Sequence, residues 1–166
     1  MGGAMQLKLK RKGDYATRAM LSVARHYGTG LRQARQISTE MQIPYKTLTL
    51  TLAGLVAEGL LVAEHGPNGG YRLARPPTDL TLLDIVEAAE GPVTFKHCVL
   101  RDGPCDWEGT CPVHDTWSQA QNALAHQLGS TTLADLAGID AAIQTGTYQP
   151  DTPPHPQHTD RHGNRT

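Results

Sequence analysis

The residues best suited to chemistry lie in one short stretch: the chain's three cysteines, Cys98, Cys105 and Cys111, are followed by His114. The spacing is C-x6-C-x5-C-x2-H, and the glycines and prolines within it predict a loop for the first two thiols. Pro112 suits the first turn of a helix, where its missing N–H costs nothing. Cys111 is therefore expected at a helix N-terminus, where the helix dipole favours a thiolate. Three thiols with an imidazole nearby form a donor set for a soft metal.

The same donor set fits more than one metal centre. Zinc accepts three cysteines and a histidine as ligands. It usually binds cysteine pairs that have two to four residues between them, and neither gap here is that short. An iron–sulfur cluster tolerates wider gaps because it presents several iron corners, so the spacing favours a cluster over zinc. A disulfide would leave one of the three thiols over. Burial as small hydrophobic side chains is disfavoured, because the loop is polar.

Two alternatives use the thiols without a metal. In a thiol switch, Cys98, Cys105 and Cys111 would be oxidised directly. In a thiol-dependent enzyme, Cys111 would be the nucleophile and His114 its base. The sequence offers no evident third residue to orient that base, so an enzyme is the least favoured of these hypotheses.

Length and composition restrict the class of protein. The chain has 166 residues, of which 39% are hydrophobic, and it has a single Phe, so we expect one modest aliphatic core. No apolar run approaches the length of a membrane span, and the basic N-terminus lacks the hydrophobic segment of a signal peptide. We therefore expect a cytoplasmic protein with no membrane partner.

Charge is divided unevenly along the chain. Residues 1–82 carry eleven Lys and Arg against five Asp and Glu, whereas residues 83–166 carry four against eleven. A basic first half and an acidic second half indicate an anionic partner for the first half, and double-stranded DNA is the natural candidate. Ordinary surface charge is the alternative.

The elements of the basic half follow the order of a winged helix-turn-helix. Apolar periodicity predicts helices over residues 14–27 and 32–41, and a third helix that Pro44 opens and Gly59 ends. Two short strands, residues 60–64 and 71–74, flank a Gly-rich turn and predict a β-hairpin. The predicted fold class is mainly α with a small β-hairpin, and residues 1–77 are the predicted winged helix-turn-helix DNA-binding domain.

In such a domain the third helix enters the major groove, and the hairpin reaches the flanking backbone or minor groove. The outward polar face of the third helix and the tip of the hairpin supply the predicted DNA-binding residues. These are Tyr45, Lys46, Thr47 and Thr49 on the helix, and His65 and Asn68 on the hairpin.

The second half is predicted to hold the cysteine loop and the contacts between two protomers. Thr81 and Asp84 form a capping-box pattern before a helix over residues 82–90, and a long helix should run from Pro112 to about Leu128. That long helix has one apolar stripe, which predicts a twofold homodimer; packing within one chain is the alternative. Residues 131–143 are expected to form a last short helix. The predicted organisation is a cluster-binding loop and dimerisation helices over 78–145 and a disordered tail over 146–166. The stripe comprises Val113, Trp117, Ala120, Leu124 and Leu128.

Over about residues 5–137, the chain resembles the Rrf2 family of bacterial transcription regulators. The resemblance is carried by the run from Arg11 to Ala16, the run from Gly66 to Leu73, the three cysteines, and the run from Thr131 to Leu136. It implies a winged helix-turn-helix homodimer that binds an operator. It also implies an iron–sulfur cluster held by the three cysteines and a fourth ligand that is not a cysteine.

The resemblance implies two candidates for that fourth ligand. His114 stands where the branch that regulates iron–sulfur biogenesis has its [2Fe-2S] histidine. Asp14 stands where the nitric-oxide-sensing branch has an aspartate that is donated across the dimer to a [4Fe-4S] cluster. The chain departs from the biogenesis branch at its first cysteine gap, where it has six residues in place of five. It also has His65 in place of an arginine, and Thr49-Leu50 in place of a Glu-Gln pair, so the operator sequence is expected to differ.

Overall fold

The computed structural model describes residues 10–93, 107 and 111–149. Most of the described chain is helical, and its strands form one antiparallel hairpin, which confirms the predicted fold class. No helix in these ranges is long and apolar enough to cross a lipid bilayer. In chain order the elements are α1 (Arg11–Ala24), α2 (Ala34–Met41), α3 (Tyr45–Ala57), β1 (Leu61–Glu64), β2 (Gly70–Leu73), a 3-10 turn (Pro77–Asp79), α4 (Leu82–Glu90), α5 (His114–Ser130) and α6 (Leu133–Gln144).

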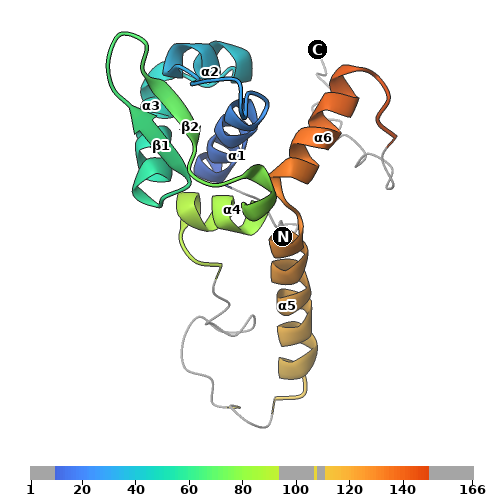
Figure 1. The fold of residues 1–166 in the computed structure, drawn as a ribbon. Helices are drawn as coiled ribbons and strands as arrows, with labels where there is room; N and C mark the ends of the chain where they lie inside the picture. The colour runs from blue at the N-terminus through green and yellow to red at the C-terminus, as the bar shows by residue number, and fades with distance from the viewer. Residues whose placement is uncertain (1–9, 94–106, 108–110, 150–166) are drawn as a thin grey trace, which may run out of the picture.

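The elements form a head with one projecting helix (Figure 1). The head comprises residues 10–93, in which α1 packs against α2, α3 and α4, and the hairpin packs on α1 and α3. Helix α5 contacts α4 and extends away from the head, with its first residues at the far end. Helix α6 then packs against α1. The cysteine segment therefore joins the head to the far end of α5.

A tight turn sets α3 against α2. Gln42 adopts a left-handed conformation with φ of 53°, and the Ser38 hydroxyl donates to the Ile43 carbonyl at 2.7 Å. Pro44 then precedes α3, consistent with the predicted start of that helix. Leu48, Leu52 and Leu55 recur at helical spacing and are buried, so the opposite face of α3 points away from the core.

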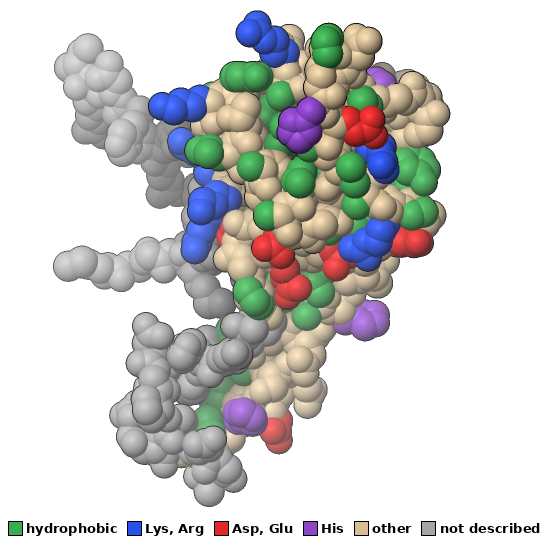
Figure 2. Space-filling view, turned by 60° about the vertical axis from the view of Figure 1, so that its left-hand side comes forward, with side chains coloured by type: hydrophobic (Ala, Val, Ile, Leu, Met, Phe, Trp, Pro, Cys, Tyr) green, Lys and Arg blue, Asp and Glu red, His purple; other side chains and the backbone are tan. Residues whose placement is uncertain are grey.

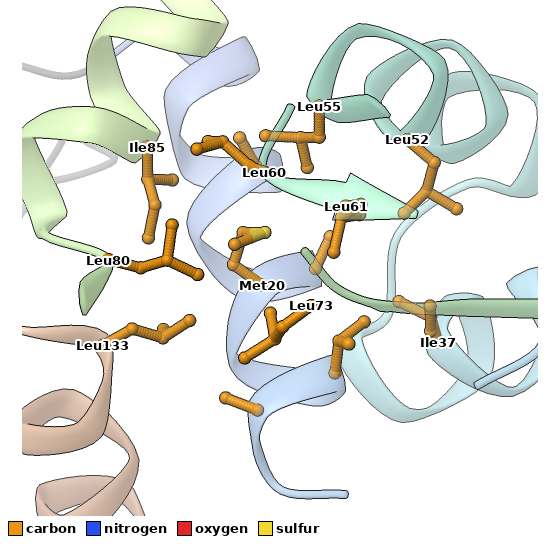
Figure 3. Close-up of a cluster of buried hydrophobic side chains, with 14 of the residues drawn as sticks. Met20, Ile37, Leu52, Leu55, Leu60, Leu61, Leu73, Leu80, Ile85 and Leu133 are labelled. Atoms are coloured by element: carbon orange, nitrogen blue, oxygen red, sulfur yellow. The ribbon is translucent and has the colours of Figure 1, made fainter. Parts of the chain in front are cut away.

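The core is aliphatic, as the composition predicts. Met20 lies near its centre, and leucine and isoleucine side chains from the surrounding elements pack around it (Figure 3). Burial of each large side chain contributes about 1.5–3 kcal/mol to folding. Leu80 and Leu133 belong to the same core, so it extends past residue 77 and includes the start of α6.

A local capping signal places the boundaries of α4 correctly. Helix α4 spans Leu82–Glu90 as predicted, and its capping box is formed: the Asp84 backbone N–H donates to the Thr81 hydroxyl at 3.1 Å, and the Thr81 backbone N–H donates to the Asp84 carboxylate at 2.8 Å. The long helix begins later than predicted. Val113 is its N-cap, so Pro112 lies before the helix and the placement of Pro112 in the first turn is wrong.

Candidate functional site

The outward face of α3 holds most of the side chains predicted to contact DNA. Tyr45 is 49% exposed, and Lys46 and Thr47 are also exposed. Thr49 is only partly exposed, and its hydroxyl donates to the Lys46 carbonyl at 2.9 Å. The structure thus presents three of the four predicted residues freely, while the Thr49 hydroxyl already has a partner.

Leu50 is exposed on the same face and was not among the predicted DNA-binding residues. Its relative exposure of 72% is the highest among the described large hydrophobic residues that lie exposed. A signal was present in the sequence, because Leu50 follows buried Leu48 by two residues and therefore lies about 200° around the helix from it. An inward-facing leucine is the common case in an amphipathic helix, which is why this one was missed.

Arg35 also lies beside this face and was missed. Its guanidinium stands over the Tyr45 ring, 5.8 Å from the ring centroid, which is a cation–π geometry. Arg35 belongs to α2 and Tyr45 begins α3, so the contact joins the two helices of the helix-turn-helix. It places an exposed positive charge next to the first turn of α3.

The hairpin presents His65 and Asn68 at its exposed tip. The start of β2, next to this tip, is held to the segment before α2, because Arg32 and Tyr71 exchange two backbone hydrogen bonds of 2.9 and 2.8 Å. A Cβ atom on Gly70 would lie 2.8 Å from the Arg32 carbonyl oxygen, so this close approach requires glycine. The wing, residues 61–73, is therefore positioned by backbone contacts rather than by its exposed side chains.

Among the residues that the structure describes, positive charge is confined to the head. In the described ranges every Lys and Arg lies between Lys10 and Arg75, and α5 and α6 contain none. Figure 2 shows these side chains over the upper part of the molecule, with none visible on the lower part that α5 forms. The predicted DNA-binding residues therefore lie on the positively charged part of the protein.

The predicted metal ligands are only partly within the described residues. Cys98 and Cys105 lie outside them. Cys111 is half-buried and forms no disulfide with a described residue, and His114, the first residue of α5, is exposed. The His114 backbone N–H donates to the Cys111 carbonyl at 3.3 Å, so one turn of chain joins the two residues. Both lie at the end of α5 that is far from the head (Figure 1).

Asp14 lies in the first turn of α1 but does not cap the helix. The N-cap is Lys10, which makes no side-chain cap. The Asp14 carboxylate instead accepts a hydrogen bond from Arg18 at 2.9 Å. Arg18 also reaches the Met41 carbonyl at 3.4 Å, at the end of α2. Asp14 is thus linked through one side chain to the turn between α2 and α3.

Within one chain, Asp14 and His114 are not brought together. Asp14 is in the first turn of α1, which belongs to the head, whereas His114 begins α5, and that helix starts at its end far from the head (Figure 1). Among the residues that the structure describes, no three His, Cys, Asp or Glu side chains are grouped so that they could hold a metal ion. The start of α1 is instead close to the end of α4, where the Gly13 N–H donates to the Glu90 carboxylate at 3.1 Å.

A polar cluster connects α6 to the helix-turn-helix. Arg25, at the end of α1, donates to the Asp140 carboxylate of α6 at 2.5 and 2.8 Å and to Glu40 of α2 at 2.6 Å. Glu40 also accepts hydrogen bonds from Ser22 at 2.5 Å and from Arg32 at 2.6 Å. Each ion-paired side chain of the cluster is at most 25% exposed.

The cluster changes the proton affinity of its members. Burial alone would raise the pKa of the Glu40 carboxyl, but hydrogen bonds from Ser22, Arg25 and Arg32 outweigh it and hold that pKa below its ordinary value. The hydrogen bond to Asp140 raises the pKa of Arg25 above its ordinary value, although burial opposes this, and Glu40 adds to the increase. These shifts favour the charged forms of Glu40 and Arg25, whose hydrogen bonds connect α2 to the end of α1 and to α6.

Comparison with known proteins supports a role in transcriptional regulation for this chain. The sequence model of the Rrf2 family, described as an iron-dependent transcriptional regulator, matches residues 9–138. An HTH-type transcriptional regulator of Neisseria meningitidis serogroup A is 31% identical over 130 residues, which cover 78% of this chain and 87% of that protein. The HTH-type transcriptional regulator IscR of Aliivibrio salmonicida is 29% identical over 152 residues, covering 84% of this chain and 90% of IscR.

Solved structures show the same fold. IscR of T. potens matches with a TM-score of 0.65 and 30% identity, covering 89% of this chain and 97% of that one. CymR, the global cysteine regulator of B. subtilis, matches with a TM-score of 0.67 and 28% identity, covering 80% of this chain and 98% of CymR. The matching structures therefore include IscR and a protein described as a global cysteine regulator.

Proposed function

Because the chain belongs to the Rrf2 family of transcriptional regulators, we propose that it is a homodimeric repressor or activator whose operator affinity is set by an iron–sulfur cluster. The observation that carries this proposal is the position of Cys111 and His114 at the start of the projecting helix of a winged helix-turn-helix protein. A regulator of this kind acts on DNA in the cytoplasm and is not an enzyme.

The DNA-binding part of the proposal rests on the exposed face of α3 and the wing. Tyr45, Lys46 and Thr47 are placed to contact base edges or phosphates in the major groove, and Thr49 borders them. His65 and Asn68 would contact the adjacent backbone or minor groove. A dimer places two such units on a partly palindromic site with half-sites about one helical turn apart.

The homodimer is supported by the unsatisfied surface of α5. None of its 17 residues is buried in the single chain, although the helix has an apolar stripe. Val113, the N-cap residue of α5 and the first residue of the stripe, is 39% exposed. A second copy of α5 against the stripe would bury both apolar faces at once.

The proposed ligands are Cys98, Cys105 and Cys111 with either His114 or Asp14. The donors fit a cluster chemically, because thiolates are its usual ligands and a histidine can replace one of them. Such a cluster would supply a centre that responds to redox state, iron supply or nitric oxide. Since Asp14 is far from Cys111 of its own chain, an Asp14 ligand would come from the partner protomer.

The two candidates for the fourth ligand have different consequences for DNA binding. His114 is one turn of chain from Cys111 and would make a local site. Asp14 is bonded to Arg18, which also donates to the carbonyl at the end of α2. A change in the partners of Asp14 would therefore reach the helix-turn-helix through Arg18, whereas a change at His114 would act through α5.

The test is to purify the protein without oxygen and to measure its visible absorption, iron, sulfide and zinc. We expect coloured protein with iron and sulfide near one cluster per protomer, and loss of the colour on replacing any of Cys98, Cys105 or Cys111 by Ala. The fourth ligand is identified by comparing the spectra of Asp14→Ala and His114→Ala with that of the wild type. Colourless protein that contains zinc would overturn the cluster proposal, and unchanged spectra in both variants would exclude both candidates.

A cluster-free thiol switch is the second candidate function. It is favoured by the structural likeness to a cysteine regulator. In that case anaerobic protein would be colourless and free of iron and zinc. Its operator affinity would change on mild oxidation, and the change would be reversed by a thiol reductant.

A further inference from the structure

We propose that Leu50 contacts the methyl group of a thymine in the major groove, and that Leu50 rather than Thr49 sets the base preference at one position of each half-site. The proposal rests on the proposed DNA-binding function, since it requires α3 to lie in the groove. It adds a specificity-determining residue and the chemical group that this residue recognises.

The placement of Leu50 in the free chain is the first argument. Leu50 is 72% exposed on the side of α3 opposite buried Leu48 and Leu52. It follows Lys46 and Thr47 by one helical turn, so the three share one face. The residues one turn further on, Ala53 and Gly54, are exposed and small. A Cβ atom on Gly54 would have no neighbour within 4 Å, so no other side chain covers this part of the helix surface next to Leu50.

The chemistry of the groove identifies what an isolated leucine can contact. Leucine has no hydrogen-bond donor or acceptor, so it cannot distinguish bases by their polar edges. The thymine methyl is the apolar group that the major groove presents, and its contact with an apolar side chain distinguishes thymine from other bases. Thr49 is less suited to this role, because it is partly buried and its hydroxyl donates to the Lys46 carbonyl.

The charges around Leu50 favour DNA over an apolar protein partner. Lys46 is exposed one turn before it, and Arg35 lies exposed against the Tyr45 ring at the start of the same helix. No Asp or Glu occurs in α3, whose residues run from Tyr45 to Ala57. This face of α3 carries positive charge and no carboxylate, so it is suited to approach the phosphates on either side of the major groove. Leu50 would then meet a thymine methyl group within the groove.

The experiment uses operator DNA that the full-length wild-type protein selects from a random pool under anaerobic conditions. Each thymine of the selected site is replaced in turn by deoxyuridine, which removes only the methyl group. For the wild type we expect about a fourfold loss of affinity at one position per half-site, the effect of burying one methyl-sized group. Leu50→Ala should bind the parent operator more weakly and show no further loss with deoxyuridine at that position.

Matched variants separate this contact from a general effect on α3. Thr49→Ala should retain the wild-type loss with deoxyuridine, and Leu50→Met should retain most of it because the apolar contact is kept. Leu50 is exposed, so Leu50→Ala should keep the thermal unfolding midpoint of the wild type, and it should also keep the salt dependence of DNA binding.

The outcomes distinguish failure of the Leu50 proposal from failure of the proposed DNA-binding function on which it rests. If the wild type selects no DNA, both the DNA-binding function and the role of Leu50 are refuted. If it selects an operator, but Leu50→Ala and the wild type lose the same affinity with deoxyuridine at every position, only the role of Leu50 is refuted. The same holds if the wild type is insensitive to deoxyuridine throughout the site.

Discussion

At the scale of single residues, the proposed DNA contacts of α3 divide into phosphate contact and base recognition. Lys46 is exposed and carries a flexible positive charge, whereas Leu50 is exposed and apolar. The first type of side chain binds any DNA, and the second discriminates between bases. We therefore expect different roles for these two exposed residues, which are one helical turn apart.

Replacement of Lys46 by Ala should weaken binding to every DNA sequence by a similar factor. One phosphate contact per protomer would be lost, so the slope of log affinity against log salt should become shallower by about 1 for each contact removed. The measurement is operator and non-operator affinity across a series of salt concentrations. Lys46→Arg is the control and should retain the slope. A loss confined to the operator would show that Lys46 contacts a base instead.

At the scale of elements, the Arg25–Glu40 cluster holds three helices together. It joins Arg25, the residue that caps the end of α1, to Glu40 of α2 and to Asp140 of α6, a residue 115 positions away from Arg25 in the chain. Its members are partly buried and mutually paired, so removal of one leaves another charged group without its partner. The cluster therefore makes the position of α2 depend on α6.

Replacement of Glu40 by Gln should lower the free energy of unfolding at neutral pH by about 1–3 kcal/mol, because hydrogen bonds from two arginines lose their charged acceptor. The Glu40 pKa is lower in the folded chain than in the unfolded one. Its stabilising contribution is thus present above the ordinary carboxyl pKa and is lost as the pH falls through the folded value.

The difference in stability between wild type and Glu40→Gln should therefore shrink as the pH falls from neutral to about 3. Urea unfolding at several pH values measures it, with Glu58→Gln at an exposed position of the head as the control. A difference that stays constant over this pH range would show that the Glu40 charge does not contribute to folding.

At the scale of the whole molecule, the head and α5 differ in charge and in burial. The head buries an aliphatic core and presents positive charge, while α5 has no Lys or Arg and buries no residue within its own chain. Such a helix is stabilised mainly by packing of its apolar face. The proposed dimer supplies that packing and at the same time brings two copies of α3 to one operator.

Replacement of Leu124 by Asp should separate the proposed dimer, because a charge would be placed in the middle of the apolar stripe. Sedimentation velocity should then show a monomer, and operator affinity should fall by more than tenfold since one protomer alone contacts a half-site. Asn122→Asp adds the same charge at an exposed position of α5 and should remain dimeric. A Leu124→Asp protein that is still a dimer would place the contact between protomers elsewhere.

Much of the fold was predictable from the sequence because its signals are local. The capping box of Thr81 and Asp84, the periodic leucines of α3 and the glycines of the wing act over a few residues, and each is found where predicted. The boundary of α5 was less predictable, since Pro112 is compatible with a position in the helix or before it. The spacing of the cysteines is likewise a property of the sequence alone, and it suggests cluster chemistry without any coordinates.

Only the tertiary structure decided how distant segments are arranged. It exposes Leu50, places Arg35 on the Tyr45 ring, joins Arg25 to Asp140, and separates Asp14 from the far end of α5. Each of these depends on which faces of different helices pack together. That packing buries apolar side chains from elements far apart in the chain against one another, and no short stretch of sequence contains it.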